Sequence, residues 1–265
     1  MLTEAIILIL AGSIVGTLSG LLGIGGGLII VPILTFVLIH FHQAAFDQAI
    51  LMAIGTSLAS IVFTGGMSSF YHTKRNNMNW STAAHYIPGV LLGSSMTAFV
   101  IPHLNIAFIK HAFIAYTFFA AYEIFKSPKI KSFIQLPSGF FANIYGFTIA
   151  SISTVIGIGG GTMFVPYFIY HKVKPRLAVG LSSSLGVFIG LGASLGFIKN
   201  GLHVSQLPKF SIGYIYLPGL ILMTSSSLIF VRLATKRIHQ ISVLSLKKIF
   251  ACLLFLIGLS MLFAG

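Results

Sequence analysis

Two glycine-rich segments with the same sequence, Gly-Ile-Gly-Gly-Gly, interrupt apolar runs of this 265-residue chain. They cover residues 23–27 and 157–161. Each interior glycine costs a helix roughly 0.8–1 kcal/mol relative to alanine, so this density predicts a helix break. A helix that resumes after the break presents unpaired N–H groups and the positive end of its dipole. These features are typical of an anion site built from backbone.

Hydroxyl side chains near both breaks could complete such a site. Neutral O–H donors can replace part of an anion's hydration shell. We therefore predict one central substrate-binding site formed by the two breaks and the neighbouring hydroxyls. Its predicted residues are Ser19, Gly23, Gly25, Gly26, Gly27, Thr56, Ser57, Ser153, Gly157, Gly159, Gly160, Gly161, Thr162, Ser182 and Ser183.

Close helix packing is the alternative explanation for glycines in apolar segments. Gly12, Gly16 and Gly20 are spaced four residues apart, a pattern that membrane helices use to approach one another. The recurrence of Gly-Ile-Gly-Gly-Gly in both halves favours a binding role at the breaks. Packing stays the competing interpretation there.

The glycine motif belongs to a longer internal repeat. SGLLGIGGGLIIVP at 19–32 corresponds to STVIGIGGGTMFVP at 153–166. Two further matches follow in the same order, AIGTS at 53–57 with AVGLS at 178–182, and Pro88-Gly89 with Pro218-Gly219. The order of the matches predicts a tandem duplication.

Composition places both copies in a membrane. Apolar residues make up 56% of the chain and charged residues 7%, against about 25% charged in soluble domains. Apolar runs long enough to cross a bilayer recur throughout, so we predict an all-α polytopic membrane protein with about 8–10 membrane-embedded helices. The predicted organisation is a first membrane repeat over 1–125, a cytoplasmic linker over 126–136 and a second membrane repeat over 137–265.

The second apolar segment of each copy, 28–39 or 162–170, is short for a crossing. We expect it to form a hairpin with the first segment that returns to its own side. With returning hairpins, 16 Lys and Arg residues divide so that only Lys110, Lys199 and Lys209 lie outside. A single crossing would divide them almost evenly, so the positive-inside rule favours the hairpin. This topology predicts inverted repeats with both termini outside, a common plan of secondary transporters.

Other function classes find little support. The net charge of +13 comes from basic residues scattered between apolar runs, so no nucleic-acid surface is expected. We find no P-loop, catalytic triad or zinc motif, and expect neither an enzyme nor a cofactor or metal; His40, His42 and Asp47 are too loosely spaced for a metal site. The acidic residues are Glu4, Asp47 and Glu123, none of them central in an apolar run, which favours an anionic over a cationic substrate.

The paired glycine motif, AIGTS, AVGLS and the Pro-Gly turns resemble the TauE/SafE family of membrane permeases over nearly the whole chain. The resemblance implies transport of small sulfur-containing anions, chiefly sulfite and organosulfonates, typically outward across the bacterial inner membrane. The two copies differ where Ala150 replaces the glycine matching Gly16, and where Leu181 stands opposite Thr56. The two half-sites are therefore not chemically equal.

The leading hypothesis is a permease that moves a small anion across the inner membrane by alternating access. A passive anion or small-solute channel and a non-transporting scaffold subunit are the alternatives. The expected partners are the anion and the lipid bilayer. Substrate identity, direction, coupling ion, the formation of a homo-oligomer and any proton transfer by His85 or His111 are left open.

Overall fold

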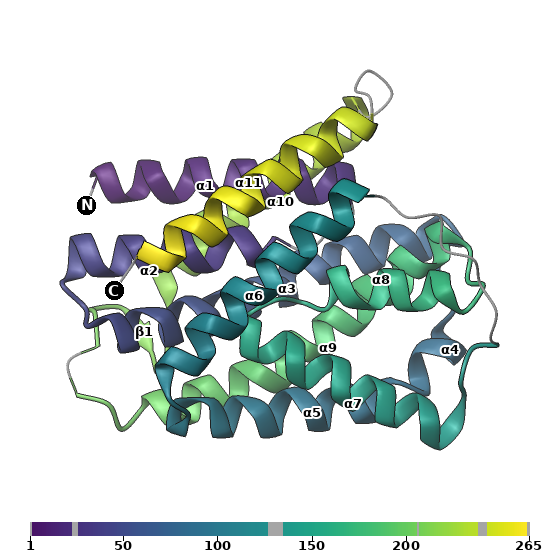
Figure 1. Ribbon diagram of the computed structural model, residues 1–265, viewed down its shortest axis with the longest axis horizontal. Coiled ribbons are helices and arrows are strands. Elements are labelled where there is room, and N and C mark those ends of the chain that lie inside the picture. Colours follow the sequence, from purple (N-terminus) through teal and green to yellow (C-terminus); the bar gives the residue numbers. More distant parts are fainter. Residues whose placement is uncertain (1, 23–25, 127–134, 206, 238–242, 264–265) are drawn as a thin grey trace.

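The computed structural model describes residues 2–22, 26–126, 135–205, 207–237 and 243–263, and within them the chain is a helical bundle (Figure 1). The first half contains α1 (Leu2–Leu22), α2 (Gly27–His42), α3 (Phe46–Lys74), α4 (Trp80–Ala84), α5 (Ile87–Val100), the 3₁₀ turn η1 (Ile101–His103) and α6 (Ile106–Lys126). The second contains α7 (Gly139–Ile156), α8 (Gly161–Tyr170), α9 (Pro175–Gly201), β1 (Ser211–Ile212), β2 (Ile215–Tyr216), α10 (Leu217–Arg237) and α11 (Val243–Phe263).

The all-α class is confirmed. Helices α4 and α5 are separate, because Pro88 at the start of α5 cannot donate the backbone hydrogen bond that a continuous helix needs. Helix α10 begins at Leu217. It is preceded by β1 and β2, which pair antiparallel around a turn that contains Gly213 at φ +56°.

Both glycine-broken hairpins return to the end at which they begin. In the first, Glu4 near the start of α1 contacts His42 at the end of α2, with 2.9 Å between the carboxylate oxygen and Nε2. In the second, the ring of His171, just after α8, lies 3.1 Å from the carbonyl oxygen of Gln135, just before α7. Direct contact between the two ends of each hairpin confirms the returning path.

The hairpins open from opposite ends of the bundle (Figure 1). We call one the terminal end, because α1 begins and α11 ends there, beside the end of α2 and the β1–β2 hairpin. We call the other the linker end, because α6 ends there, near α4 and the start of α9. The chain connectivity therefore gives each end one hairpin.

Helices α3 and α9 form the centre of the bundle. Within their apolar windows 67% and 61% of residues are buried, against 33% for α7. Both helices are long and apolar enough to cross a membrane, as is α7, in the part of the chain that the structure describes. They cross closely at Gly190 of α9, where an added Cβ would lie 2.6 Å from the carbonyl oxygen of Leu58.

The outer helices pair between the two halves. Helix α1 packs on α10, and its counterpart α7 packs on α5, while α6 packs on α11. Each half therefore buries its first helix against the other half. The halves form one folded unit whose core is shared.

The bundle turns large apolar side chains outward along its length. Fully folded soluble proteins rarely expose contiguous apolar surface of this kind, and lipid-facing surfaces require it. The exposed set includes Leu10, Phe63, Leu92, Phe119, Phe141, Leu195, Ile221 and Leu256. Many hydroxyl side chains point inward instead, including those of Ser57, Ser94, Thr117 and Ser184.

Replacement of Gly190 by alanine tests the α3–α9 crossing. The added Cβ would meet the Leu58 carbonyl and lie 2.8 Å from Cγ2 of Val62. Because the nearest atom is backbone, the helices must separate, and we expect a loss of roughly 1–3 kcal/mol in the free energy of unfolding. The thermal midpoint in detergent measures it.

Gly66→Ala on α3 is the matched control, since a Cβ there has nothing within 4 Å. This variant should unfold at or above the wild-type temperature, because alanine favours the helix. Equal midpoints for the two variants would contradict the close crossing.

Candidate functional site

The two glycine breaks lie in direct contact inside the bundle. A Cβ added to Gly27, the first residue of α2, would lie 2.5 Å from the carbonyl oxygen of Gly157 and 2.9 Å from Cα of Ile158. Gly157 and Ile158 belong to the second break, 130 residues further along the chain. Only a residue without a side chain permits this approach, so the glycine at 27 is required by the meeting of the two halves.

The second break uses left-handed backbone, which glycine adopts without a steric cost. Gly157 ends α7 at φ +79°, and Gly160 precedes α8 at φ +72°. The N–H of Ile158 donates to the carbonyl of Ser153 at 2.9 Å, which closes the end of α7. The carbonyl of Gly160 then accepts from Met163 and Phe164 and begins α8. The chain thus reverses within four residues.

Ser57 of α3 joins both breaks. Its Oγ is fully buried and donates a 2.8 Å hydrogen bond to the carbonyl oxygen of Gly157. The same Oγ would lie 3.1 Å from a Cβ on Gly27. The Ser57 hydroxyl, the N-terminus of α2 at Gly27 and the carbonyl of Gly157 therefore lie close together beside α3.

The helices that restart at the breaks begin with backbone donors that have no acceptor among the described residues. No side chain that the structure describes caps α2 or α8. Within the described chain, the N–H groups of Gly27, Leu28, Gly161 and Thr162 have no hydrogen-bond acceptor. No Asp, Glu, Lys or Arg occurs in α2 or α8, nor between Asp47 and Lys74 on α3. The electrostatic potential at the breaks therefore comes from peptide dipoles and hydroxyls, which suits an anion.

The other predicted hydroxyls take different positions. Oγ1 of Thr56 accepts a 2.9 Å hydrogen bond from the N–H of Tyr216, and Oγ1 of Thr162 accepts one of 2.6 Å from the hydroxyl of Tyr116. The Oγ atoms of Ser183 and Ser68 lie 2.9 Å apart between α9 and α3. These three residues therefore connect separate elements of the fold, and each already has a protein partner.

Ser153 and Ser182 are buried hydroxyls that lack an oxygen or nitrogen partner among the described residues, as a predicted donor to a substrate would. Ser153 is fully buried, and among the described residues its Oγ contacts the sulfur of Met163, at 3.5 Å. Ser182 is the repeat counterpart of Ser57, and its buried Oγ has no hydrogen-bond partner among the described residues. A buried hydroxyl without a partner carries a free-energy cost that a bound ligand can remove.

The remaining predicted glycines divide between packing and positions outside the description. Gly26 lies against Val15 of α1, and Gly159 lies against Ile61 of α3. The small-residue ladder of α1 packs as the alternative interpretation expects, with Gly12 and Gly16 against the backbone of α10. Gly161 is the first residue of α8. Gly23, Gly25 and the side chain of Ser19 lie outside the described residues.

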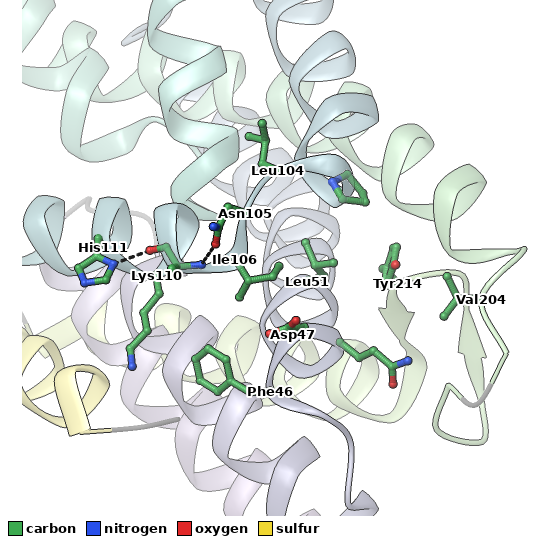
Figure 2. Close-up of a pocket in the computed structure, with 13 residues that line it drawn as sticks. Phe46, Asp47, Leu51, Leu104, Asn105, Ile106, Lys110, His111, Val204 and Tyr214 are labelled. Atoms are coloured by element: carbon green, nitrogen blue, oxygen red, sulfur yellow. Dashed lines mark hydrogen bonds between the residues drawn. The ribbon is translucent and has the colours of Figure 1, made fainter.

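Sequence reasoning missed a cavity of about 730 Å³ at the terminal end (Figure 2). We call it the vestibule. Its wall comes from the start of α3, from the η1–α6 connection and from the residues that precede α10, as Figure 2 shows with Leu51, Asn105 and Tyr214. Asp47 lies here in the first turn of α3, and His111 lies here with its ring bonded to the carbonyl of Ala107. Because segments far apart in the sequence form this cavity, no local sequence pattern predicts it.

A buried polar cluster near the vestibule was also missed. The hydroxyl of Tyr216 donates to the Glu4 carboxylate and lies 2.8 Å from Nε2 of His42. Burial, with Glu4 adding to it, raises the pKa of Tyr216 well above its usual range, so the phenol stays protonated. His42 also pairs with Glu4, at 2.9 Å. The residues that the structure describes contain no group of three or more His, Cys, Asp or Glu that could hold a metal ion.

The histidines left open as proton carriers are both exposed. Nδ1 of His85 lies 2.8 Å from the carbonyl oxygen of Ser81 at the linker end. Nδ1 of His111 bonds a carbonyl of its own helix at the terminal end. Neither ring contacts the glycine breaks.

Comparison with known proteins gives a consistent family result. A family model described as "Sulfite exporter TauE/SafE" matches residues 8–261. A probable membrane transporter protein of Haemophilus influenzae is 32% identical over 98% of this chain and 99% of that protein. Another, of Methanocaldococcus jannaschii, is 29% identical over 97% of this chain and 94% of that protein. No solved structure matches the chain.

Replacement of Ser57 by alanine tests the contact between α3 and the second break. The carbonyl of Gly157 would lose a buried donor, so we expect the free energy of unfolding to fall by roughly 1–3 kcal/mol. Thermal unfolding in detergent measures this loss.

Ser184→Ala is the matched control. Ser184 is equally buried but donates to the Leu181 carbonyl of its own helix, which keeps its helical N–H partner. This variant should lose much less stability. A larger loss in Ser184→Ala than in Ser57→Ala would show that the link between the breaks contributes little.

Proposed function

The chain belongs to the sulfite exporter TauE/SafE family of membrane transporters, and we propose that it is a secondary carrier for a small anion, a sulfur oxyanion or organosulfonate. One observation carries this proposal. Gly27 meets Gly157 beside the hydroxyl of Ser57, in a region that holds unpaired N–H groups and no charged side chain among the described residues.

We propose that the anion binds by replacing its water shell with these donors. The N–H groups at the starts of α2 and α8 would donate first, since they have no acceptor among the described residues. The buried hydroxyls of Ser182 and Ser153 would add donors without adding charge. An uncharged donor set holds an anion less tightly than arginine would, which lets a carrier release its cargo.

We propose alternating access as the mechanism. Each broken hairpin is anchored at a different end of the bundle, through Glu4 and His42 at one end and His171 and Gln135 at the other. Each also contributes a break to the same central contact. Inverted repeats of this kind rock one half against the other around a fixed site. The equivalent pairings of α1 with α10 and α7 with α5 support such a relation.

The proposed orientation follows from the basic residues. Among the described residues, the linker end carries Lys74, Arg75 and Lys126, while Lys110, Lys199 and Lys209 lie toward the terminal end. The positive-inside rule then places the linker end in the cytoplasm and both termini outside. The inner membrane of a bacterial cell is the proposed location.

A passive anion channel is the second candidate. The unpaired N–H groups and hydroxyls that favour an anion would serve a channel equally well. Saturation of uptake with rising anion concentration separates a carrier from a channel, since a channel keeps conducting in proportion to concentration. A scaffold subunit, the third class, would give no flux after purification.

Substitution of the break glycines tests the site. Leucine at Gly160 would need a left-handed backbone at φ +72°, and its Cβ would lie 2.8 Å from Phe164 and Ile189. Gly26→Leu would collide with Val15. We expect both variants to insert into the membrane and to lose at least about 90% of uptake, because the donors at α2 and α8 move.

Gly66→Leu is the control, because a Cβ there meets nothing within 4 Å. It should transport at the wild-type rate and be present in the membrane in the same amount. Wild-type uptake in Gly26→Leu and Gly160→Leu would disprove the proposed site.

The substrate class is tested with the purified protein in proteoliposomes. Labelled sulfite, sulfate and a small sulfonate are compared with acetate, with and without an imposed pH gradient. We expect saturable uptake of one sulfur anion and none of acetate. Uptake that responds to the gradient would identify coupling to protons, and an absence of flux for every sulfur anion would contradict the proposed class.

A further inference from the structure

Two glycines at equivalent positions of the repeats are in close contact with backbone carbonyls of the segments that precede the Pro-Gly turns. Gly55 of α3 lies against the carbonyl oxygen of Tyr214, 2.9 Å from an added Cβ. Gly180 of α9, its counterpart in AVGLS, lies against the carbonyl of Asn77. Each central helix therefore carries a glycine on which a connecting segment rests, one near each end of the bundle.

At the terminal end this segment contacts α3 between the residues that line the vestibule and the residue that holds the second break. Tyr214 and Leu51 are both on the vestibule wall (Figure 2). One turn deeper along α3, Gly55 contacts Tyr214, and the Tyr216 N–H donates to Oγ1 of Thr56. The next residue is Ser57, which holds the second break. Along α3, the β1–β2 hairpin therefore lies between the vestibule and the central contact.

The hairpin is wedged between the two central helices. Its Tyr214 N–H donates to the carbonyl of Phe197 on α9 at 3.1 Å, and Gly213 lies against the backbone of Ile198. On the other side, the carbonyl of Tyr214 lies against Gly55 of α3. Displacement of this short segment alone would open the vestibule inward, without separating α3 from α9.

A side-chain cluster holds the hairpin in place. The Tyr216 hydroxyl is buried and bonds both Glu4 of α1 and His42 of α2. It therefore ties the hairpin to the start and the end of the first broken helical hairpin. The Tyr216 N–H also donates to Oγ1 of Thr56. At the matching position of the second repeat stands Leu181, whose side chain cannot accept a hydrogen bond. This difference between the repeats therefore leaves the equivalent bond without an acceptor at the linker end.

We propose that the β1–β2 hairpin, residues 211–216, is the gate between the vestibule and the anion site, and that Tyr216 latches it through Glu4, His42 and Thr56. The gate rests on the proposed transport function. It deepens that function by assigning the terminal-end barrier to one small segment. Its closed state is assigned to Tyr216, whose hydroxyl contacts Glu4 and His42 and whose N–H donates to Thr56.

Accessibility of a cysteine below the gate tests the proposal without measuring transport. The full-length protein carries Cys252→Ala, which removes its single cysteine, and Ser60→Cys. Ser60 is buried on α3 and bonds only its own helix; it lies about 7.5 Å beyond Gly55 at the helical rise. A membrane-impermeant maleimide is applied to intact cells and, separately, to inside-out membrane vesicles.

Tyr216→Phe and Thr56→Val are introduced separately in this background. Thr56→Val removes the acceptor of the Tyr216 N–H, and Tyr216→Phe removes the hydroxyl that contacts both Glu4 and His42. Each change keeps the shape of the side chain. We expect either change to raise the rate of labelling about tenfold from one membrane face, because one such bond shifts the closed-to-open equilibrium by about that factor. Labelling from the other face should not change.

Tyr214→Phe is the matched control. It makes the same chemical change on the same hairpin, but the structure gives the Tyr214 hydroxyl no hydrogen-bond partner among the described residues. It should label at the background rate. Thermal unfolding of all variants confirms that they are folded.

Faster labelling from both faces, or no increase in either latch variant, would overturn the gate. An increase shared by Tyr214→Phe would overturn the role of the Tyr216 latch. These results are independent of uptake. If Tyr216→Phe labels faster in a protein that transports no sulfur anion, the gate stands and the proposed substrate class fails. If sulfite uptake is saturable while labelling never changes, the carrier stands and the gate fails.

Discussion

A broken helix inside an apolar bundle must find partners for the peptide groups that the break releases, because lipid supplies none. In this protein the two breaks meet at Gly27 and Gly157, and the Ser57 hydroxyl satisfies one of the released carbonyls. The N–H groups at the starts of α2 and α8 stay unpaired within the described chain. Both breaks therefore carry backbone donors that have no acceptor within the described chain, and no charged side chain of α2 or α8 lies beside them.

The same close contact sets the arrangement of the helices. Backbones can approach at Gly27 and Gly190 only because no Cβ intervenes, and these approaches hold α2 against the second break and α3 against α9. The anchoring contacts lie elsewhere, at Glu4 with His42 and at His171 with Gln135. Rigid contacts at the two ends and a small-residue contact at the centre are compatible with movement of one half against the other.

Individual residues show how far the sequence could predict the site. The glycine breaks, Ser57 and the returning hairpins followed from composition, helix propensity and the distribution of basic residues. Thr56, Thr162 and Ser183 were grouped with the site, yet each bonds a partner on another element, because the rotation of a helix is decided by packing rather than by residue type. Tyr216 and the β1–β2 hairpin escaped notice, since four residues of strand within an apolar run have no distinct period.

The sequence by itself determined the class of the protein, its duplication and the positions at which the helices break. Those properties depend on local composition and on glycine's effect on the backbone, which act wherever the segment lies. Only the tertiary structure decided that Gly27 touches Gly157, that Ser57 rather than Thr56 serves the break, and that Glu4, His42 and Tyr216 form one cluster. These contacts join residues 38 to 212 positions apart, and such pairings are set by the packing of whole helices, which a local pattern does not encode.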